Sequence, residues 1–321
     1  MAEPAPGVAQ ALEQWLCARG IEAQAEVTGR ATVGLSQETW FVRIATGGGS
    51  RAAVLRLPTA ASGPHAIRTQ RVALEAVAGK VPAPALLWHD DGDDNPFSRP
   101  FIVMERIAGE VPVGWHEIAE PRRTLLAQAA IDVLSALHAI DPAPLNGPSA
   151  AKGRPTEFDW YRRRLERFKP LPAVLEGARW WLDRHAPQRA TREVLVHGDY
   201  RMGNLIVDDT SIRGVLDWEM AGAGDPMADL AWCFIPVWEL PGVSEAPLVV
   251  RYAERSGIRV DEERLHWHRV LAYVRLAYYA LAGSYAFDSG HSSDFRLAAL
   301  RLQLPVHLDR LAATIAGEPV T

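Results

Sequence analysis

Three oxygen-bearing side chains follow short apolar stretches in the second half of the chain. Asp199 and Asn204 lie in the sequence HGDYRMGN, and Asp217 directly follows the stretch Ile212–Leu216. Carboxylate and amide oxygens are the ligands that Mg²⁺ prefers, and substrate phosphates often complete such sites. A further carboxylate beside the cation can take a proton from a hydroxyl group. These residues therefore predict a phosphoryl-transfer site.

The elements that position these residues are expected to be strands and a hairpin. Val194–Val196 is expected to be a strand that delivers His197 and Asp199. Leu205–Val207 then turns back into Ile212–Leu216, which ends on Asp217. The expected result is a hairpin that presents two carboxylates and one amide.

Two further features of this hairpin have structural interpretations. Asp208 and Asp209 lie at its turn, where Asp tolerates the backbone angles that a turn requires. His197 is expected to hold the hairpin in place rather than to take part in catalysis.

The order His197, Asp199, Asn204 has the H-x-D-x-x-x-x-N spacing of kinase catalytic loops. In transfer of a γ-phosphoryl group, the protein mainly positions the reactants and neutralises charge. Asn204 and Asp217 would then bind Mg²⁺, and Asp199 would orient and deprotonate the accepting hydroxyl. Arg201 is expected to stabilise charge in the transition state, because a guanidinium group stays protonated.

These segments resemble the aminoglycoside phosphotransferase and choline kinase family, small-molecule kinases with a protein-kinase-like fold. The resemblance covers nearly the whole chain and is strongest in HGDYRMGN, LDWE at 216–219 and GDPMADLAW at 224–232. More narrowly, the chain is similar to the branch whose domains are sometimes fused to acyl-CoA dehydrogenases. The resemblance implies a two-lobed α+β fold, with a small β-rich N-lobe at 1–104, a hinge at 105–109 and a larger, mostly helical C-lobe at 110–321.

The N-terminal part of the chain has elements in the order that this fold requires. Helical spacing predicts a helix over Val8–Arg19, and strands are expected at Thr39–Ile44 and Ala52–Leu57. Gly34 and Ser36 precede the first of these strands and form a candidate phosphate-covering loop, because backbone N–H groups can approach phosphate oxygens closely. The alternative interpretation is that this segment is an ordinary turn between two strands.

Arg56 lies where kinases place the lysine that binds the α- and β-phosphates. An arginine keeps the positive charge and can bind phosphate bidentately. In this fold the next helix, here Ile67–Ala78, usually supplies a glutamate to that cation, but the chain has Gln70 at the position. Gln70 can hydrogen-bond to Arg56 without pairing its charge, and Glu75 lies a turn or more away. The carboxylate partner of Arg56 is therefore left open.

A nucleotide base would bind at the predicted hinge. The apolar strand Phe101–Met104 leads into it, and the backbone of Glu105 and Ile107 would hydrogen-bond the base of ATP or GTP. The C-lobe is expected to contain a long helix over Pro121–Ile140 and a buried helix over Val270–Phe287.

The acceptor pocket is expected in the C-lobe. Its polar and aromatic candidates are Asp159, Trp160, Tyr161, Arg163, Glu219, Trp232, Tyr273 and Tyr278, although aromatic residues at helical spacing more often belong to a core. Relatives that bind aminoglycosides tend to present an acidic loop, because a polycation needs carboxylate partners. No comparable acidic cluster occurs near the C-terminus, so an uncharged or mildly polar hydroxyl acceptor is expected.

Composition limits the partners of the chain. Its 321 residues carry 34 basic and 39 acidic side chains, so the charge balance does not favour binding to nucleic acid or to an anionic membrane. The N-terminus lacks the pattern of a secretory signal, and Val270–Phe287 is interrupted by Arg275. Because the chain has only two cysteines, a reducing, cytoplasmic location is expected. The protein is expected to be a monomer or a homodimer.

The sequence therefore predicts an ATP- or GTP-dependent, Mg²⁺-dependent O-phosphotransferase that acts on a small molecule. A nucleotide-binding regulatory protein with little catalysis is the alternative, and only Arg56 and Gln70 favour it. A protein kinase is disfavoured, because no A-P-E ending follows Asp217. Phosphorylation of aminoglycoside or macrolide antibiotics is less expected.

Overall fold

The computed structural model describes residues 7–31, 37–59, 62–112, 118–145, 157–187, 192–235 and 243–317. The chain divides into two compact units: residues 1–145 with 194–223, and residues 146–193 with 224–321. The lobe boundaries 1–104, 105–109 and 110–321 stay a prediction.

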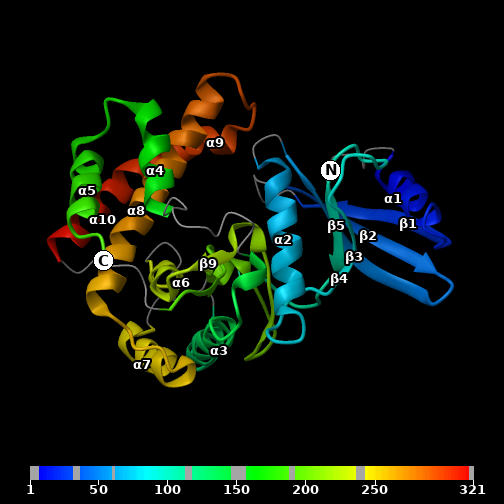
Figure 1. Ribbon diagram of the computed structural model, residues 1–321, viewed down its shortest axis with the longest axis horizontal. Helices are drawn as coiled ribbons and strands as arrows, with labels where there is room; N and C mark the ends of the chain where they lie inside the picture. The colour runs from blue at the N-terminus through cyan, green and yellow to red at the C-terminus, as the bar shows by residue number, and fades with distance from the viewer. Residues whose placement is uncertain are drawn as a thin grey trace. The chain divides into compact units, whose positions relative to one another are not determined.

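A five-stranded antiparallel sheet organises the first unit (Figure 1). Its strand order is β1-β2-β3-β5-β4. The strands predicted at Thr39–Ile44 and Ala52–Leu57 are confirmed as the central parts of β2 and β3. The strands span β1 Ala23–Arg30, β2 Gln37–Thr46, β3 Gly49–Pro58, β4 Leu86–Asp90 and β5 Phe101–Glu105.

The two faces of this sheet differ because side chains alternate along each strand. Trp40 and Leu55, which are paired across β2 and β3, belong to a buried cluster with Leu12 and Leu16 of α1 (Val8–Cys17). The next pair, Thr39 with Arg56, lies on the opposite face. There Arg56 contacts α2 (Gly63–Val77), and Figure 1 shows α1 and α2 on opposite sides of the sheet. One face is therefore a hydrophobic core, and the other carries polar groups.

Both helices were predicted, with small differences at their ends. The first was expected to continue to Arg19 but ends at Cys17. The second begins at Gly63, ahead of the predicted start at Ile67. Pro64 accounts for the earlier start, because proline is well tolerated in the first turn of a helix.

The first unit also contains α3 (Arg122–Leu137) and the short strands around the HGDYRMGN segment. β7 (Leu205–Val207) and β8 (Ile212–Val215) form the predicted antiparallel hairpin. β6 (Val194–Val196) pairs with β9 (Gly222–Gly224). Asn204 therefore directly precedes β7, and Asp217 lies two residues beyond β8.

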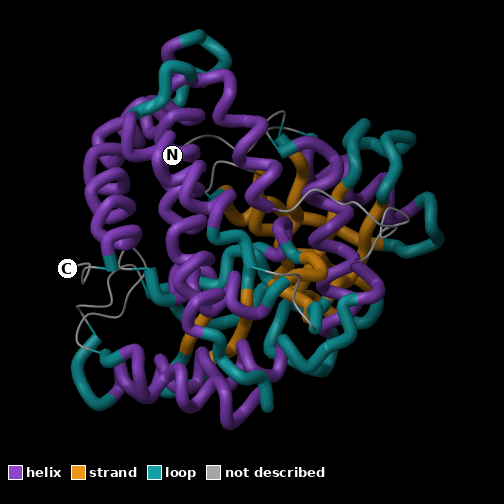
Figure 2. Tube along the Cα trace, turned by 60° about the vertical axis from the view of Figure 1, so that its left-hand side comes forward, coloured by secondary structure: helices purple, strands orange, loops and turns teal. Residues whose placement is uncertain are grey.

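The described elements of the second unit are helices, and Figure 2 draws helices in purple. α8 includes the predicted helix Val270–Phe287, and α6 begins at Pro226 after Asp225, whose side chain accepts a hydrogen bond from the Met227 amide. Within the described residues, no helix is long and apolar enough to cross a membrane. The helices span α4 Glu157–Leu165, α5 Ala173–Arg184, α6 Pro226–Cys233, α7 Glu245–Ser256, α8 Glu262–Asp288, α9 Phe295–Ala299 and α10 Leu304–Ala316.

The predicted fold class is confirmed. The N-terminal part is built on an antiparallel sheet, and the C-terminal part is mostly helical. This α+β arrangement places the residues with candidate chemistry, Asp199, Asn204 and Asp217, in the same compact unit as Arg56.

We predict that α1 contributes substantially to the stability of the sheet. Leu12 is fully buried in the cluster that α1 forms with β2 and β3. Replacing it in Leu12→Ala should lower the free energy of unfolding by about 2–5 kcal/mol, measured by urea denaturation. Gln10→Ala, at an exposed position of the same helix, should change it by less than about 0.5 kcal/mol. Equal stability of the two variants would contradict this role for α1.

Candidate active site

Asp199 and Asn204 are held together by two hydrogen bonds. The Asn204 side-chain amide donates from Nδ2 to Asp199 Oδ2 at 2.7 Å and to the Asp199 carbonyl at 2.9 Å. Because Nδ2 faces Asp199, Oδ1 faces away, and no hydrogen bond to Oδ1 is made within the described residues. Asn204 therefore orients the Asp199 carboxylate, and its Oδ1 is an oxygen that could bind a cation.

Arg201 folds back over the same loop. Its Nε donates to Asp199 Oδ2 at 3.3 Å. The guanidinium occupies the space that a side chain at position 203 would need, since a Cβ on Gly203 would lie 2.4 Å from Arg201 Nη1. Gly203 thus permits a positive charge beside the predicted base.

His197 connects the two halves of the site. Its Nδ1 accepts a hydrogen bond from the Asp199 amide at 3.1 Å, so the opposite nitrogen, Nε2, donates to the Leu216 carbonyl at 2.9 Å. Gly198 has a φ of 80°, and a Cβ there would lie 2.5 Å from the Met220 carbonyl oxygen. His197 therefore fixes Asp199 against the strand that leads to Asp217, in the structural role predicted for it.

Tyr200 anchors the loop to α3. Its buried hydroxyl donates to the Ala130 carbonyl at 2.6 Å. The Leu216 amide donates to the Asn204 carbonyl at 2.8 Å, which places Asn204 next to the segment that carries Asp217. The loop is thus held on both sides by hydrogen bonds.

Asp217 adopts the left-handed backbone conformation, with φ 70° and ψ 54°. This conformation is costly for a residue other than glycine and occurs preferentially at functional sites. Its Oδ1 accepts a hydrogen bond from Arg56 Nη1 at 2.8 Å. Burial raises the pKa of the Asp217 carboxyl, but the charge and hydrogen bond of Arg56 outweigh burial and hold the pKa below its usual value. Asp217 is therefore ionised at neutral pH, as a metal ligand must be.

Arg56 makes its remaining contacts on the same face of the sheet. Gln70 Oε1 accepts from Arg56 Nη1 at 3.2 Å, and Thr39 Oγ1 accepts from Arg56 Nε at 3.3 Å. The predicted contact between Arg56 and Gln70 is thus present. Its carboxylate partner, which the sequence left open, is Asp217, 161 residues away in the chain.

A second contact joins the Asp217 turn to the sheet. Gln37, the first residue of β2, donates from Nε2 to Glu219 Oε2 at 2.6 Å. Glu219 was a candidate for the acceptor pocket, and Gln37 was not singled out. The only sequence signal for Gln37 is that it lies two residues before Thr39 and so on the same face of the strand.

The remaining residues predicted to bind the nucleotide lie at two places. Gly34 and Ser36 fall outside the described residues. At the predicted hinge, the Glu105 amide donates to the Ala85 carbonyl at 2.8 Å. Within the described residues, the backbone of Ile107 has no hydrogen bond, so its N–H and C=O groups could bind a base.

Most of the aromatic candidates for the acceptor pocket lie in a hydrophobic core. Tyr161, Trp232, Tyr273 and Tyr278 belong to a buried cluster of the second unit, whereas Trp160 is 38% exposed. Arg275 lies over the Trp232 ring at 3.9 Å. Asp159 pairs with Arg162, and Arg163 is exposed. The core interpretation therefore holds for these four aromatic residues.

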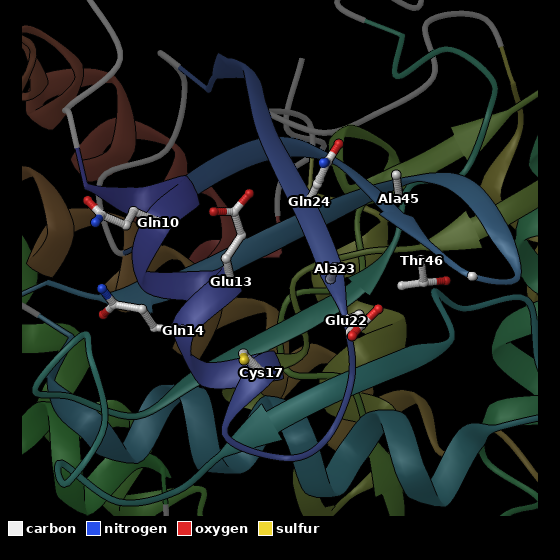
Figure 3. A pocket seen from close by; sticks show the side chains of 10 residues that line it. Gln10, Glu13, Gln14, Cys17, Glu22, Ala23, Gln24, Ala45 and Thr46 are labelled. Atoms are coloured by element: carbon white, nitrogen blue, oxygen red, sulfur yellow. The ribbon is translucent and has the colours of Figure 1, made fainter.

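A hollow of about 750 Å³ lies elsewhere in the first unit, beside α1 and β1 (Figure 3). Its lining includes Glu13, Cys17 and Gln24, and it contains none of the predicted site residues. It is therefore separate from the polar groups around Arg56 and Asp217.

The donor set fits a hard cation that substrate phosphates complete. Within the described residues, no three His, Cys, Asp or Glu side chains form a group that could hold a metal ion by themselves. Mg²⁺ often binds through one or two carboxylates together with water and phosphate oxygens. The Asp217 carboxylate and Asn204 Oδ1 are protein donors of that kind.

Comparisons with known proteins identify the family and the fold. The profile of the phosphotransferase enzyme family matches residues 29–273. A Ralstonia eutropha structure assigned to the aminoglycoside phosphotransferases has a TM-score of 0.74 at 22% identity, covering 97% of this chain and 98% of its own. An aminoglycoside phosphotransferase solved with ADP and hygromycin B has a TM-score of 0.64 at 19% identity, covering 96% and 98%. At these identities the two structures show the fold alone.

The curated relatives include acyl-CoA dehydrogenase family members. Member 11 of Homo sapiens is 26% identical over 309 residues, which is 85% of this chain and 37% of the relative. Member 10 of Mus musculus is 30% identical over 220 residues, which is 62% of this chain and 19% of the relative. The chain thus spans less than two fifths of the length of these relatives.

We predict that the Tyr200 hydroxyl stabilises the loop around Asp199. Tyr200→Phe removes the buried hydrogen bond to the Ala130 carbonyl and should lower the free energy of unfolding by about 1 kcal/mol. Tyr285→Phe removes a hydroxyl from a half-exposed tyrosine and should have no measurable effect. Urea denaturation of both variants tests this, and an unchanged Tyr200→Phe midpoint would contradict it.

Proposed function

The chain belongs to the phosphotransferase enzyme family, and we propose that it is a kinase that transfers the γ-phosphoryl group of ATP or GTP to a hydroxyl of a small molecule. The observation that carries this proposal is the pair of contacts that define the site. Asn204 orients the Asp199 carboxylate, and Arg56 holds the ionised Asp217 carboxylate in the same unit.

In this proposal Asp199 is the base. It accepts the proton of the acceptor hydroxyl as the hydroxyl oxygen bonds to the γ-phosphorus. The bond between that phosphorus and the β–γ bridging oxygen breaks, and the nucleoside diphosphate leaves. The Asn204 hydrogen bond at 2.7 Å supports this role, because it leaves the direction of the carboxylate fixed.

The other residues act on charge. Asn204 Oδ1 and Asp217 would hold Mg²⁺, which supplies neutralisation of the phosphate charge when it is bound. Arg56 is assigned to the α- and β-phosphates, and Arg201, at 3.3 Å from Asp199, to charge that develops during transfer. Gly34, Ser36, Glu105 and Ile107 are assigned to the nucleotide through their backbones.

The alternative of a nucleotide-binding protein with little catalysis rested on Arg56 and Gln70. The hydrogen bond between these two residues weakens that case, because Gln70 supports Arg56 without a glutamate. The three oxygen-bearing residues Asp199, Asn204 and Asp217 are all present. Catalysis is therefore the better interpretation.

For the acceptor, we propose a hydroxyl group on the acyl chain of a coenzyme A thioester, an anion, in place of the uncharged or mildly polar acceptor that the sequence predicts. The curated relatives are named as acyl-CoA dehydrogenase family members, and this chain matches only a minor part of their length. The segment between α3 and β6, where the sequence places part of the acceptor pocket, carries exposed Arg163, Arg164 and Arg167. Such a surface suits a phosphorylated anion better than the polycationic aminoglycosides.

We predict that Asp199→Asn lowers turnover by at least about 100-fold, because a general base typically contributes a factor of this size or more. Nucleotide affinity should stay nearly unchanged. Asp209→Asn, at the exposed turn of the same hairpin, should keep wild-type turnover. Release of nucleoside diphosphate with an accepted substrate measures both variants, and full turnover by Asp199→Asn would remove Asp199 as the base.

The acceptor can be identified by transfer of labelled phosphate from ATP and from GTP. We expect phosphorylation of hydroxyacyl-CoA thioesters, and at most weak phosphorylation of free sugars, aminoglycosides and macrolides. The same acyl thioesters without the hydroxyl group are the matched controls and should not be labelled. Efficient phosphorylation of an aminoglycoside would overturn the proposed acceptor and leave the kinase assignment standing.

A further inference from the structure

Gln37 is a buried polar residue at the edge of the site with no role in the proposed mechanism. It begins β2 and is 7% exposed. Its Nε2 donates to Glu219 Oε2 at 2.6 Å. A side-chain amide in this position can serve the site or merely stabilise the fold, and its two polar atoms distinguish these roles.

The Glu219 carboxylate fixes which way the Gln37 amide faces. An ionised carboxylate only accepts hydrogen bonds, so Nε2 must face it and Oε1 must face away. Within the described residues, Gln37 Oε1 is buried and has no hydrogen-bond partner. A buried acceptor without a donor destabilises a protein and is rare in folded structures. The arrangement therefore indicates a donor that arrives with a ligand.

Gln37 lies on the same face of the sheet as Arg56, which pairs with the proposed metal ligand. Gln37 and Thr39 lie on one face of β2, and Thr39 contacts Arg56 on that face. On the opposing turn, Asp217 bonds to Arg56 and Glu219 bonds to Gln37. Two residues of one turn are thus tied to neighbouring strands, and one of them is the proposed metal ligand.

The two ties respond differently to a cation. A cation at Asp217 competes with Arg56 for the carboxylate, so the tie between Arg56 and Asp217 weakens when the site is loaded. The tie between Gln37 and Glu219 involves neither group and persists. The hydrogen bond between Gln37 and Glu219 can therefore hold the turn against the sheet while the cation replaces Arg56 at Asp217.

We propose that Gln37 is a positioning residue for the metal–nucleotide complex. Its Nε2 holds Glu219, and through it the turn that bears Asp217, while its Oε1 would accept a hydrogen bond from a donor that the metal–nucleotide complex brings. The inference rests on the proposed function, because it requires a Mg²⁺–nucleotide complex at Asp217.

The test compares nucleotide binding with and without the metal. Isothermal titration calorimetry of the full chain with a non-hydrolysable ATP analogue is carried out in Mg²⁺ and again in EDTA. Gln37→Leu should weaken binding about tenfold in Mg²⁺, which corresponds to about 1.4 kcal/mol, and by less than about twofold in EDTA. Gln24→Leu, the same exchange at an exposed position of β1, should match wild type in both. Asp217→Ala gives the reference for complete loss of the metal effect.

Glu219→Gln provides a second variant that does not remove Gln37. An amide partner no longer fixes the direction of the Gln37 amide, so the Mg²⁺-dependent affinity should fall about threefold. This variant decides the outcome if Gln37→Leu fails to fold, which urea denaturation would reveal. A loss of equal size in Mg²⁺ and in EDTA would show a purely structural contact and overturn the inference, as would no loss.

These outcomes separate the inference from the function on which it rests. Wild-type protein that binds the analogue in Mg²⁺, together with variants that bind it equally well, overturns only the role of Gln37. Wild-type protein without Mg²⁺-dependent binding overturns the proposed function, and the role of Gln37 with it.

Discussion

The ion pair between Arg56 and Asp217 is the contact on which the site depends. Both side chains are mostly removed from solvent, at 12% and 27% exposure, so each charge needs its partner. The pair connects the middle of the sheet to a turn far along the chain. Asp217 holds a strained backbone conformation there, which persists only when surrounding contacts enforce it. Arg56 supplies one of those contacts from a rigid strand.

Side-chain hydrogen bonds from His197 and Asn204 connect this turn to Asp199. His197 bonds to the residue before Asp217 and to the Asp199 amide, so the two carboxylates are set relative to one another through one buried imidazole ring. Asn204 completes the arrangement from the other side. Glycine at 198 is required because a Cβ there would collide with the Met220 backbone, whereas a side chain at 203 would displace the Arg201 guanidinium. The sequence HGDYRMGN thus contains both the candidate catalytic residues and the glycine that makes room for their backbone.

Local patterns in the sequence predict much of this arrangement. They do not predict contacts between residues that are far apart in the chain. The hairpin and the residues Asp199, Asn204 and Asp217 follow from spacing, because they lie within one short segment. Gln70 could be located beside Arg56, since a helix that follows a strand has limited freedom. The partners Asp217 and Glu219 could not be assigned, because that requires knowing which turn meets the polar face of β2 and β3 across more than 160 residues.

The neutral Gln70 follows from the way in which Arg56 is paired. A glutamate at this position would place a second carboxylate next to Arg56, which already bonds to Asp217. Two fixed negative charges around one guanidinium would oppose the approach of phosphates. With Gln70, Asp217 is the one carboxylate paired with Arg56 among the described residues. If Asp217 binds Mg²⁺ as proposed, the charge of Arg56 becomes available to a phosphate, while Gln70 still holds the guanidinium in place.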